Sequence, residues 1–388
     1  LAFLLPLLLQ LDPTCEEVQL LILVPSRELA IQIEQVVRQM GTGFKVNAVY
    51  GGRAGSKDRM EIKHRPAVLV GTPGRVADHL RREAFDTAFI QCLVLDEFDK
   101  SLEIGFEGEM RDILHALPGV GRKILTSATQ GVEIPRFVGL KSPQVLDFLE
   151  DKISQLQVKK VLSPTKDKLE TLGQLLGQLG SKNGIIFCNF KDSIQRVSES
   201  LSDRGISHGI FSGGMEQIDR ERSLIKFRNG TYPLLLATDL AARGIDVPEL
   251  DFIIHYHLPL RAEEFIHRNG RTARMNSEGT AYILQYEKEP LPDFVGRPTL
   301  EKLRPSTLPA PSAWSTLLIS GGRKDKISKG DIAGFFLKQG GIQSDALGAI
   351  ELKTDCAFVA VKSVVLEQLL SKVNNQKLKE KKVRISLI

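Results

Sequence analysis

The stretch "QCLVLDEFDK", from Gln91 to Lys100, decides the fold class of this 388-residue chain. A short run of apolar, strand-forming residues ends directly at two adjacent carboxylates, Asp96 and Glu97. Similar runs surround it and alternate with helical patterns: "LLILVP" (20–25), "NAVYGG" (47–52), "AVLVGTP" (67–73) and "KILTSAT" (123–129). Uniformly apolar strands between helices are typical of a parallel sheet covered on both faces. The stretch therefore predicts an α/β domain with a ligand site where its strands end.

The same alternation restarts further along the chain, at "GIIFCNF" (184–190), "GIFSGG" (209–214), "LLLATDL" (234–240) and "DFIIHYHLP" (251–259). It predicts a second parallel α/β domain, with a hinge somewhere in residues 149–168. Six prolines between Glu287 and Trp314 indicate a linker. The expected domains are 1–150, 151–287 and 312–388, with the Pro-rich linker at 288–311.

Composition limits the class of protein and the compartment. A hydrophobic content of 42% is enough for two or three domains with cores of their own. The four cysteines have no metal-ligand spacing, which predicts a reducing, cytoplasmic location. The apolar run "LAFLLPLLLQL" (1–11) is too short to span a bilayer and lacks the basic region and cleavage site of a signal peptide. We therefore expect a core helix there and no membrane partner.

Positive charge is concentrated at the C-terminal end. Residues 312–388 hold 13 lysines and arginines against 7 aspartates and glutamates, a net charge of +6, while the whole chain carries +5. A basic module on a nearly neutral body indicates a polyanionic partner. An ordinary solvated surface is the alternative.

Asp96-Glu97-Phe98-Asp99, followed by Ser127-Ala128-Thr129, resembles two sequence motifs of the DEAD-box RNA helicases. Further blocks of that family occur in the same order: "PSRELA" (25–30), "GG" (51–52), "TPGR" (72–75), "SGGMEQIDRERSLIKFRNG" (212–230), "ATDLAARGID" (237–246) and "HRNGRTAR" (267–274). The resemblance implies two tandem RecA-like parallel-sheet domains, the first of them incomplete here, that bind ATP and RNA.

In the first domain, the resemblance implies the acidic side of an ATP site. Asp96 would hold Mg²⁺ through water, and Glu97 would act as the base that deprotonates a water. Asp99 would bond Ser127 and Thr129 and so couple the nucleotide site to RNA.

In the second domain, the resemblance implies the remaining nucleotide contacts. Gly244 and Asp246 would bind the nucleotide, Asp246 through its ribose. His267, Arg271 and Arg274 belong to the last block, and the two arginines would reach the γ-phosphate as arginine fingers.

RNA would be held by its backbone across both domains. The residues that match the family's RNA contacts are Pro25, Arg27, Gly52, Thr72 and Arg75 in the first domain and Gly213 and Thr238 in the second. Glycines let backbone N–H groups approach phosphates closely, and such contacts carry position but not sequence. Read without the family, Gly51-Gly52 and Gly213-Gly214 are ordinary turns.

The chain departs from the family pattern at a few positions. Phe98 replaces a small alanine, so we expect altered packing behind the loop with the catalytic neighbours intact. Asn269 replaces an apolar residue and Ala273 a glycine, while Ser26 keeps the hydroxyl of the usual threonine.

One required element is missing from the sequence. The family's ATP site needs a phosphate loop, G-x-x-x-x-G-K-[ST], and no such string occurs in the 388 residues. In the family a helix like "LAFLLPLLLQL" follows that loop at once. We therefore expect a chain truncated before this helix, with no appreciable ATPase activity as it stands.

The C-terminal segment predicts a small RNA-binding domain. Its strands and helices follow the order βαββαβ of an RRM, although only Ala357-Phe358-Val359 of the usual third-strand octamer remain. Residues 317–336 resemble the RNA-binding domain of DbpA-type helicases, which implies a hairpin of large-subunit ribosomal RNA. Candidate phosphate contacts are Arg323, Lys324, Lys326, Lys329 and Arg384. A module for protein contacts is the alternative.

These patterns support two hypotheses of function. The first is an ATP-dependent RNA helicase, expected as a monomer, that unwinds short duplexes of structured ribosomal RNA during ribosome assembly with ATP and Mg²⁺. The second is an ATPase-deficient RNA-binding assembly factor or clamp.

Overall fold

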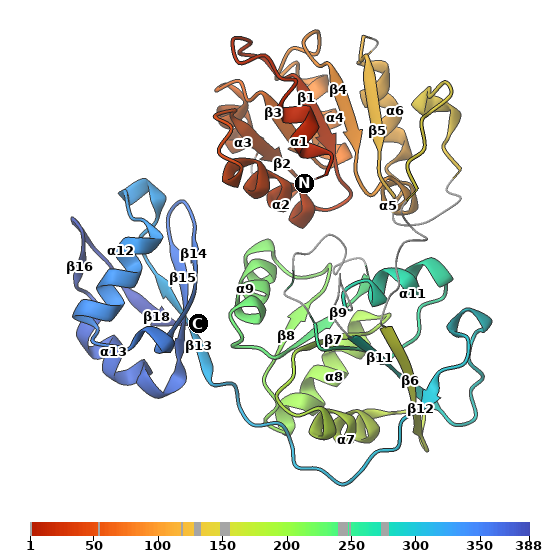
Figure 1. Cartoon of the computed structure of the whole chain (residues 1–388), viewed down its shortest axis with the longest axis vertical. Helices are drawn as coiled ribbons and strands as arrows, with labels where there is room; N and C mark the ends of the chain where they lie inside the picture. Colours follow the sequence, from red (N-terminus) through yellow and green to blue (C-terminus); the bar gives the residue numbers. More distant parts are fainter. Residues whose placement is uncertain are drawn as a thin grey trace. The chain divides into compact units, whose positions relative to one another are not determined.

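The computed structural model describes residues 2–52, 55–117, 119–127, 133–147, 156–239, 247, 250–272 and 279–388. These residues form two compact units, one up to Asp147 and one from Leu156 onward (Figure 1). The first unit is one α/β domain, and the second holds another α/β domain followed by a C-terminal domain. The predicted boundary after residue 150 falls outside the described residues. All four cysteines are free.

The first domain is built on a fully parallel sheet with the strand order β2-β3-β1-β4-β5. Its strands are β1 (Leu20–Leu23), β2 (Val46–Val49), β3 (Val68–Gly71), β4 (Cys92–Leu95) and β5 (Arg122–Leu125). One face packs against α1 (Leu4–Leu8) and α2 (Arg27–Gln39). The other packs against α4 (Pro73–Arg81), α5 (Phe98–Ile104), α6 (Glu107–His115) and the end of α3 (Gly55–Ile62).

Burial explains why this sheet was readable from the sequence. Every residue of β1, β3 and β4 is buried, because helices cover both faces and neighbouring strands cover both edges. The outer strand β5 is partly exposed. The five apolar runs quoted above correspond to β1 through β5.

The second domain also has a fully parallel sheet, with the strand order β12-β6-β11-β10-β7-β9-β8. Its strands are β6 (Leu156–Ser163), β7 (Gly184–Phe187), β8 (His208–Phe211), β9 (Leu234–Ala237), β10 (Phe252–His255), β11 (Gly279–Tyr286) and β12 (Thr299–Leu300). Helices α7 (Leu169–Leu179) and α8 (Lys191–Asp203) cover one face. Phe265 of α11 (Ala262–Asn269) packs on Ile283 of the opposite face, and α9 (Gln217–Arg228) lies against β8.

Three strands of this sheet were not predicted. Strand β6 lies within the segment expected to hold the hinge, where Lys159 and Lys160 interrupt the apolar pattern. Strand β11 pairs with β6 over eight residues, and β12 lies inside the expected linker. The Pro-rich segment therefore runs along the second domain, where the Glu301 carboxylate lies 2.8 Å from the Lys159 amine.

The C-terminal domain has the predicted βαββαβ order. Strands β13 (Trp314–Ile319), β14 (Leu347–Leu352), β15 (Ala357–Lys362) and β18 (Ile385–Leu387) form an antiparallel sheet in the order β14-β15-β13-β18. Helix α12 (Lys329–Gly334), a π-helical turn at Phe335–Gln339 and α13 (Leu366–Val373) complete one core with this sheet. A hairpin of β16 (Lys377–Leu378) and β17 (Lys381–Lys382) precedes the last strand. The fold class predicted for the chain is confirmed.

Helix α9 and the residues that follow it contact the C-terminal domain within the second unit. The Lys353 amine lies 2.6 Å from a carboxylate oxygen of Glu221 and 2.7 Å from one of Glu351. The hydroxyls of Thr231 and Thr316 are 2.7 Å apart.

Among the described residues of the chain, no helix has both the length and the apolar character needed to cross a bilayer.

We expect Gly340→Ala to destabilise the C-terminal domain. A Cβ at this position would lie 2.4 Å from both Leu369 Cδ1 and the Phe336 carbonyl oxygen. Such overpacking costs about 1–3 kcal/mol. Trp314 is the single tryptophan of the chain, so its fluorescence during urea unfolding reports on this domain.

Gly334→Ala is the matched control, because no atom lies within 4 Å of an added Cβ at the end of α12. Its urea midpoint should equal or exceed that of the wild type. Equal midpoints for Gly340→Ala and the wild type would contradict the packing argument.

Candidate functional site

The carboxyl ends of the five parallel strands place the first domain's candidate residues along one sheet edge. The RNA candidates follow three adjacent strands, β2, β3 and β1: Gly52, Thr72, Arg75, Pro25 and Arg27. The hydrolysis candidates Asp96, Glu97 and Ser127 follow the other two strands, β4 and β5. The sheet order alone therefore places the RNA candidates on one half of this edge and the hydrolysis candidates on the other.

Asp96 is held at the end of β4 by both of its neighbouring strands. Its backbone N–H donates to the Leu23 carbonyl of β1 at 2.9 Å, and its carboxylate accepts a hydrogen bond from the Thr126 hydroxyl. Burial raises the pKa of Asp96, and the Thr126 hydrogen bond opposes that rise. Thr126 was not predicted, because nothing in the sequence distinguished it from its neighbours in "KILTSAT".

Glu97 has an unusual backbone conformation. Its φ is 46°, in the left-handed region that non-glycine residues rarely adopt. Thr126 fixes this turn at two points: its hydroxyl accepts the Glu97 N–H at 3.2 Å, and its carbonyl accepts the Phe98 N–H at 3.0 Å. A strained conformation costs about 1–3 kcal/mol and persists where the surroundings hold it in this way.

Phe98 packs behind the turn, in the core shared with α4 and α6, and is only 2% exposed. Asp99 and Lys100 are also buried, and the Lys100 amine lies 2.7 Å from Glu103 Oε1 and 3.6 Å from Asp99 Oδ2. The predicted bonds of Asp99 to Ser127 and Thr129 stay a prediction. Thr129 lies outside the described residues.

A single carboxylate at this position suits Mg²⁺. This ion usually keeps several waters and binds through one or two carboxylates plus substrate phosphates. Asp96 offers one carboxylate, and the described residues contain no cluster of three His, Cys, Asp or Glu that could enclose a metal. The residues present therefore fit an ion held by Asp96 through water.

Arg27 and the glycine pair meet on the half of the edge that carries the RNA candidates. Gly52 has a φ of 82°, and an added Cβ would lie 2.3 Å from Arg27 Nη1. The left-handed backbone conformation therefore favours glycine at this position, and an added Cβ would displace the Arg27 guanidinium. Ser26 begins helix α2 by accepting a hydrogen bond from the Leu29 N–H at 3.2 Å.

Arg75 is oriented by a carboxylate that was not predicted. Its Nε donates to Asp58 Oδ2 at 2.7 Å, and the Asp58 side chain is fully buried. His79 Nε2 lies 3.5 Å from the same oxygen. Thr72 precedes α4 as its N-cap residue. Asp58 could not be found from the sequence, because it lies 17 positions before Arg75 and on another helix.

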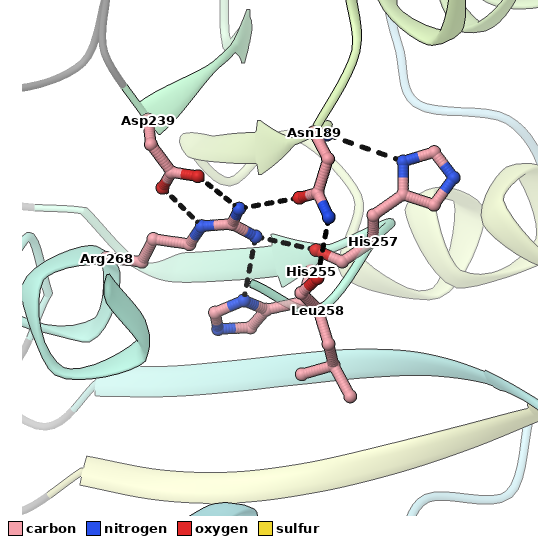
Figure 2. Close-up of polar contacts among 6 residues, drawn as sticks. All are labelled: Asn189, Asp239, His255, His257, Leu258 and Arg268. Atoms are coloured by element: carbon pink, nitrogen blue, oxygen red, sulfur yellow. Dashed lines mark hydrogen bonds and ion pairs between the residues drawn. The ribbon is translucent and has the colours of Figure 1, made fainter. Parts of the chain in front are cut away.

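In the second domain, a cluster around Arg268 connects the ends of three adjacent strands (Figure 2). The Arg268 guanidinium donates to both carboxylate oxygens of Asp239, after β9, at 2.6 and 2.5 Å. It also donates to Asn189 Oδ1, after β7, at 2.8 Å and to the His257 carbonyl, after β10, at 2.6 Å. The Arg268 side chain is 1% exposed, so this arginine has a structural role.

Asn269, one of the departures from the family, has a clear partner. Its Oδ1 lies 2.9 Å from Nε2 of the buried His255. Arg268 Nη1 lies 3.5 Å from His255 Nδ1. Because a guanidinium can only donate, Nδ1 carries the lone pair and Nε2–H donates to Asn269.

Two histidines of this cluster are neutral in the folded protein. Burial and the nearby Arg268 charge lower the pKa of His255 to about 3. Burial and the charges of Lys168 and Arg268 lower the pKa of His257 to about 4.

The remaining candidates of this domain are only partly described. Gly213 follows β8, and Thr238 follows β9. His267 lies in the last turn of α11, and the Arg271 N–H donates to the Arg268 carbonyl at 3.1 Å in the turn that follows. Three predicted nucleotide contacts lie outside the described residues: Gly244, Asp246 and Arg274.

In the C-terminal domain, the segments that carry the basic candidates are joined to one another or to a neighbouring hairpin. The loop with Arg323, Lys324, Lys326 and Lys329 is tied to the β16–β17 hairpin, since Lys381 lies 2.8 Å from Asp325 and Lys379 lies 2.7 Å from Asp331. The hydrogen bond from Lys381 lowers the pKa of Asp325. Hydrogen bonds from Lys379 and Ser328 lower the pKa of Asp331 to about 2. The Arg384 N–H donates to the Ser320 hydroxyl at 2.7 Å. Phe358 on β15 is 5% exposed and offers no open stacking surface.

Three family models match successive parts of the chain. They are a DEAD/DEAH box helicase domain over residues 1–137, a helicase conserved C-terminal domain over 167–276 and a DbpA RNA binding domain over 316–387. The ATP-dependent RNA helicase DbpA of Escherichia coli K12 is 31% identical over 401 residues, which cover 100% of this chain and 88% of the relative. This chain belongs to the DbpA family of DEAD-box RNA helicases.

Other similar proteins agree with this assignment. The DbpA of Bacillus subtilis strain 168 is 29% identical, over 95% of this chain and 84% of the relative. A solved structure, "S. cerevisiae Dbp5 bound to RNA and ADP BeF3", has 27% identity and a TM-score of 0.67, over 74% of this chain and 76% of that chain. The two parallel-sheet domains of this DbpA-family chain are thus RecA-like, and the C-terminal domain is of the RNA-binding type.

We expect the second domain of this DbpA-family chain to lose stability as the pH falls below 6.5. His255 and His257 have folded pKa values of about 3 and 4, against 6.5 when unfolded. Only the unfolded chain takes up protons between these values, so their contribution is complete above pH 6.5 and declines toward pH 4. Between pH 6.5 and about pH 5, each histidine should lower the free energy of unfolding by about 2 kcal/mol.

Pulse proteolysis in urea at both pH values, with peptides assigned by mass spectrometry, measures this change domain by domain. His255→Gln removes one of the two titrating histidines. The change in the free energy of unfolding that this pair causes between the two pH values should therefore be about half as large in the variant as in the wild type. An unchanged pH dependence in that variant would refute the assignment of a depressed pKa to His255.

Proposed function

We propose that this protein is an ATP-dependent RNA helicase that separates short RNA duplexes, acting on large-subunit ribosomal RNA during ribosome assembly. The observation that carries the proposal is the first domain's sheet edge. There the left-handed Asp96-Glu97 turn follows β4, and the RNA candidates Gly52, Thr72 and Arg27 follow the three strands beside it. Hydrolysis and RNA binding would thus occur on one rigid sheet.

The proposed hydrolysis uses the chain's own residues in distinct roles. Asp96 would hold the Mg²⁺ that neutralises phosphate charge, and Glu97 would accept the proton of the attacking water. Arg271 and Arg274 would stabilise charge on the γ-phosphate, and Gly244 and Asp246 would bind the nucleotide. Thr126 would transmit changes between the two strand ends, because it bonds both Asp96 and Glu97.

The C-terminal domain would select the RNA. Its net charge of +6 attracts any RNA, so selectivity must come from the spacing of its phosphate contacts. Two ion pairs support selection by spacing, because they join the basic loop at residues 323–329 and the start of α12 to the β16–β17 hairpin. A monomer in the cytoplasm is the state that we propose for this activity.

The alternative function is an ATPase-deficient RNA clamp, which would bind RNA through the same candidates without hydrolysing ATP.

Glu97→Gln separates the two functions. For a helicase, we expect RNA-stimulated ATP hydrolysis by a form that carries the phosphate loop to fall by about 10²–10⁴-fold, because the amide cannot accept the proton. RNA affinity without nucleotide should stay unchanged. Glu107→Gln, on the exposed face of α6, is the control and should keep wild-type turnover. A wild-type form that carries the phosphate loop and binds RNA but hydrolyses no ATP would contradict the helicase and leave the clamp.

Residues 312–388, expressed alone, should fold and bind a ribosomal RNA hairpin more tightly than an unstructured RNA of equal length. These residues have a core of their own, with seventeen buried residues that include members of every strand of the four-stranded sheet. Affinity for both RNAs should fall steeply with salt, because phosphate contacts release counterions. Titrations with both RNAs at two salt concentrations measure this difference. Equal affinities would reduce the domain to a nonspecific basic module, and binding to neither would favour protein contacts.

A further inference from the structure

Phe190 is an exposed aromatic side chain at the carboxyl edge of the second domain's sheet. It follows β7 by three positions and immediately precedes α8. Its exposed fraction is 66%, whereas Phe187, Phe211 and Phe252 of the same sheet are buried. No role has been assigned to Phe190 so far.

The local fold does not account for a phenylalanine at this position. Phe190 is the N-cap residue of α8, and its side chain makes no cap hydrogen bond. Ser, Thr, Asp and Asn are preferred there, because their side chains accept a hydrogen bond from the first turn of the helix. Phenylalanine thus gives up a cap and exposes an apolar ring without gaining burial.

The backbone that carries the ring is firmly held. Asn189, directly before it, is fixed by three hydrogen bonds (Figure 2). Its Oδ1 accepts from Arg268 at 2.8 Å, its Nδ2 donates to the Leu258 carbonyl at 2.8 Å, and its backbone N–H donates to His257 Nδ1 at 3.4 Å. The His257 ring meets the Phe190 ring edge-on, with centroids 6.1 Å apart. An aromatic ring held in place before binding loses little entropy when a ligand stacks on it.

RNA candidates lie on the strands beside this ring. Strand β7 is followed in the sheet by β9 and β8, whose carboxyl ends lead to Thr238 and Gly213. Lys191, the next residue after Phe190, reaches this loop: its amine lies 2.8 Å from the position of an added Cβ on Gly214. An exposed ring and an ammonium group therefore share the edge on which the RNA backbone is expected.

We propose that Phe190 stacks on a nucleobase of single-stranded RNA bound along this edge. The inference rests on the proposed function and deepens it, because the other candidates on this edge are expected to contact only the RNA backbone. Every base has a π-face, so stacking adds affinity without sequence preference. An aromatic platform beside a positively charged group is the usual arrangement of sites for single-stranded nucleic acid.

The test uses the full chain and an oligouridylate of about ten nucleotides, a length within the usual site size. One form carries 5-iodouridine for photo-crosslinking, and another carries abasic nucleotides. The variants are Phe190→Ser, Phe190→Trp and the control Phe89→Ser. Phe89 is a second exposed phenylalanine, located before β4 at the opposite, amino edge of the first domain's sheet.

We expect Phe190 to be a crosslinked residue in the wild type. Phe190→Ser should weaken binding of the intact RNA about tenfold and leave binding of the abasic RNA unchanged. It should also raise the melting temperature by about 2 °C, because serine restores the cap of α8. Phe190→Trp should keep wild-type affinity, and Phe89→Ser should change neither RNA affinity.

Two results would overturn the proposal, and they are distinguishable. In the first, the wild type binds the RNA, but Phe190→Ser loses equal affinity for intact and abasic RNA, or the crosslinks lie only at other residues. Either finding would refute stacking and leave the proposed helicase function standing. A wild type that binds no RNA would refute the proposed function together with this inference.

Discussion

The parallel pairing of apolar strands is the constraint on which the rest of this structure depends. Strands buried on both faces and both edges hold few polar side chains, so the candidates for chemistry in the two parallel-sheet domains lie beyond the ends of these strands. Parallel pairing then directs all these ends to one edge of each sheet. In the first domain this rule alone brings Asp96, Glu97 and Arg27 to a common edge, although they come from distant parts of the chain.

Each edge is held together by one polar group that bonds neighbouring strand ends, half-buried in the first domain and buried in the second. In the first domain this group is Thr126, which bonds Asp96 and both N–H groups of the following turn. In the second it is the Arg268 guanidinium, which bonds Asp239, Asn189 and the His257 carbonyl. A buried guanidinium is stable only when its donors are paired. Both groups therefore limit how far one strand end can shift without moving its neighbours.

Much of the fold could be predicted from the sequence, and the failures have physical causes. Strands β1, β3, β4, β7, β9 and β10 were readable because burial on all sides leaves them almost wholly apolar. The edge strands β2, β5 and β8 were readable because they keep short apolar runs. Strands β6 and β12 were missed because they lie near an edge of the sheet, where Lys159 and its ion pair with Glu301 replace apolar packing. Predicted site residues were found from short linear motifs, so their partners in space were missed. Asp58 for Arg75 and His255 for Asn269 are contacts that only folding creates.

Helix α9 connects the carboxyl edge of the second domain's sheet to the C-terminal domain. It begins three residues after Gly214. Glu221 within the helix pairs with Lys353 of the C-terminal domain, and Arg228 at the end of the helix pairs with Glu351. Its twelve residues span about 18 Å as an α-helix, which is short enough to move as one rigid body. The hydroxyl pair of Thr231 and Thr316 adds a neutral contact just beyond this helix. Because the ion pairs are formed by long side chains and the hydroxyl pair by short ones, only the latter sets a close approach of the two domains. A base stacked on Phe190 and a phosphate held by the C-terminal domain would then be gripped by parts of one unit, so the RNA between them would be held at two fixed points.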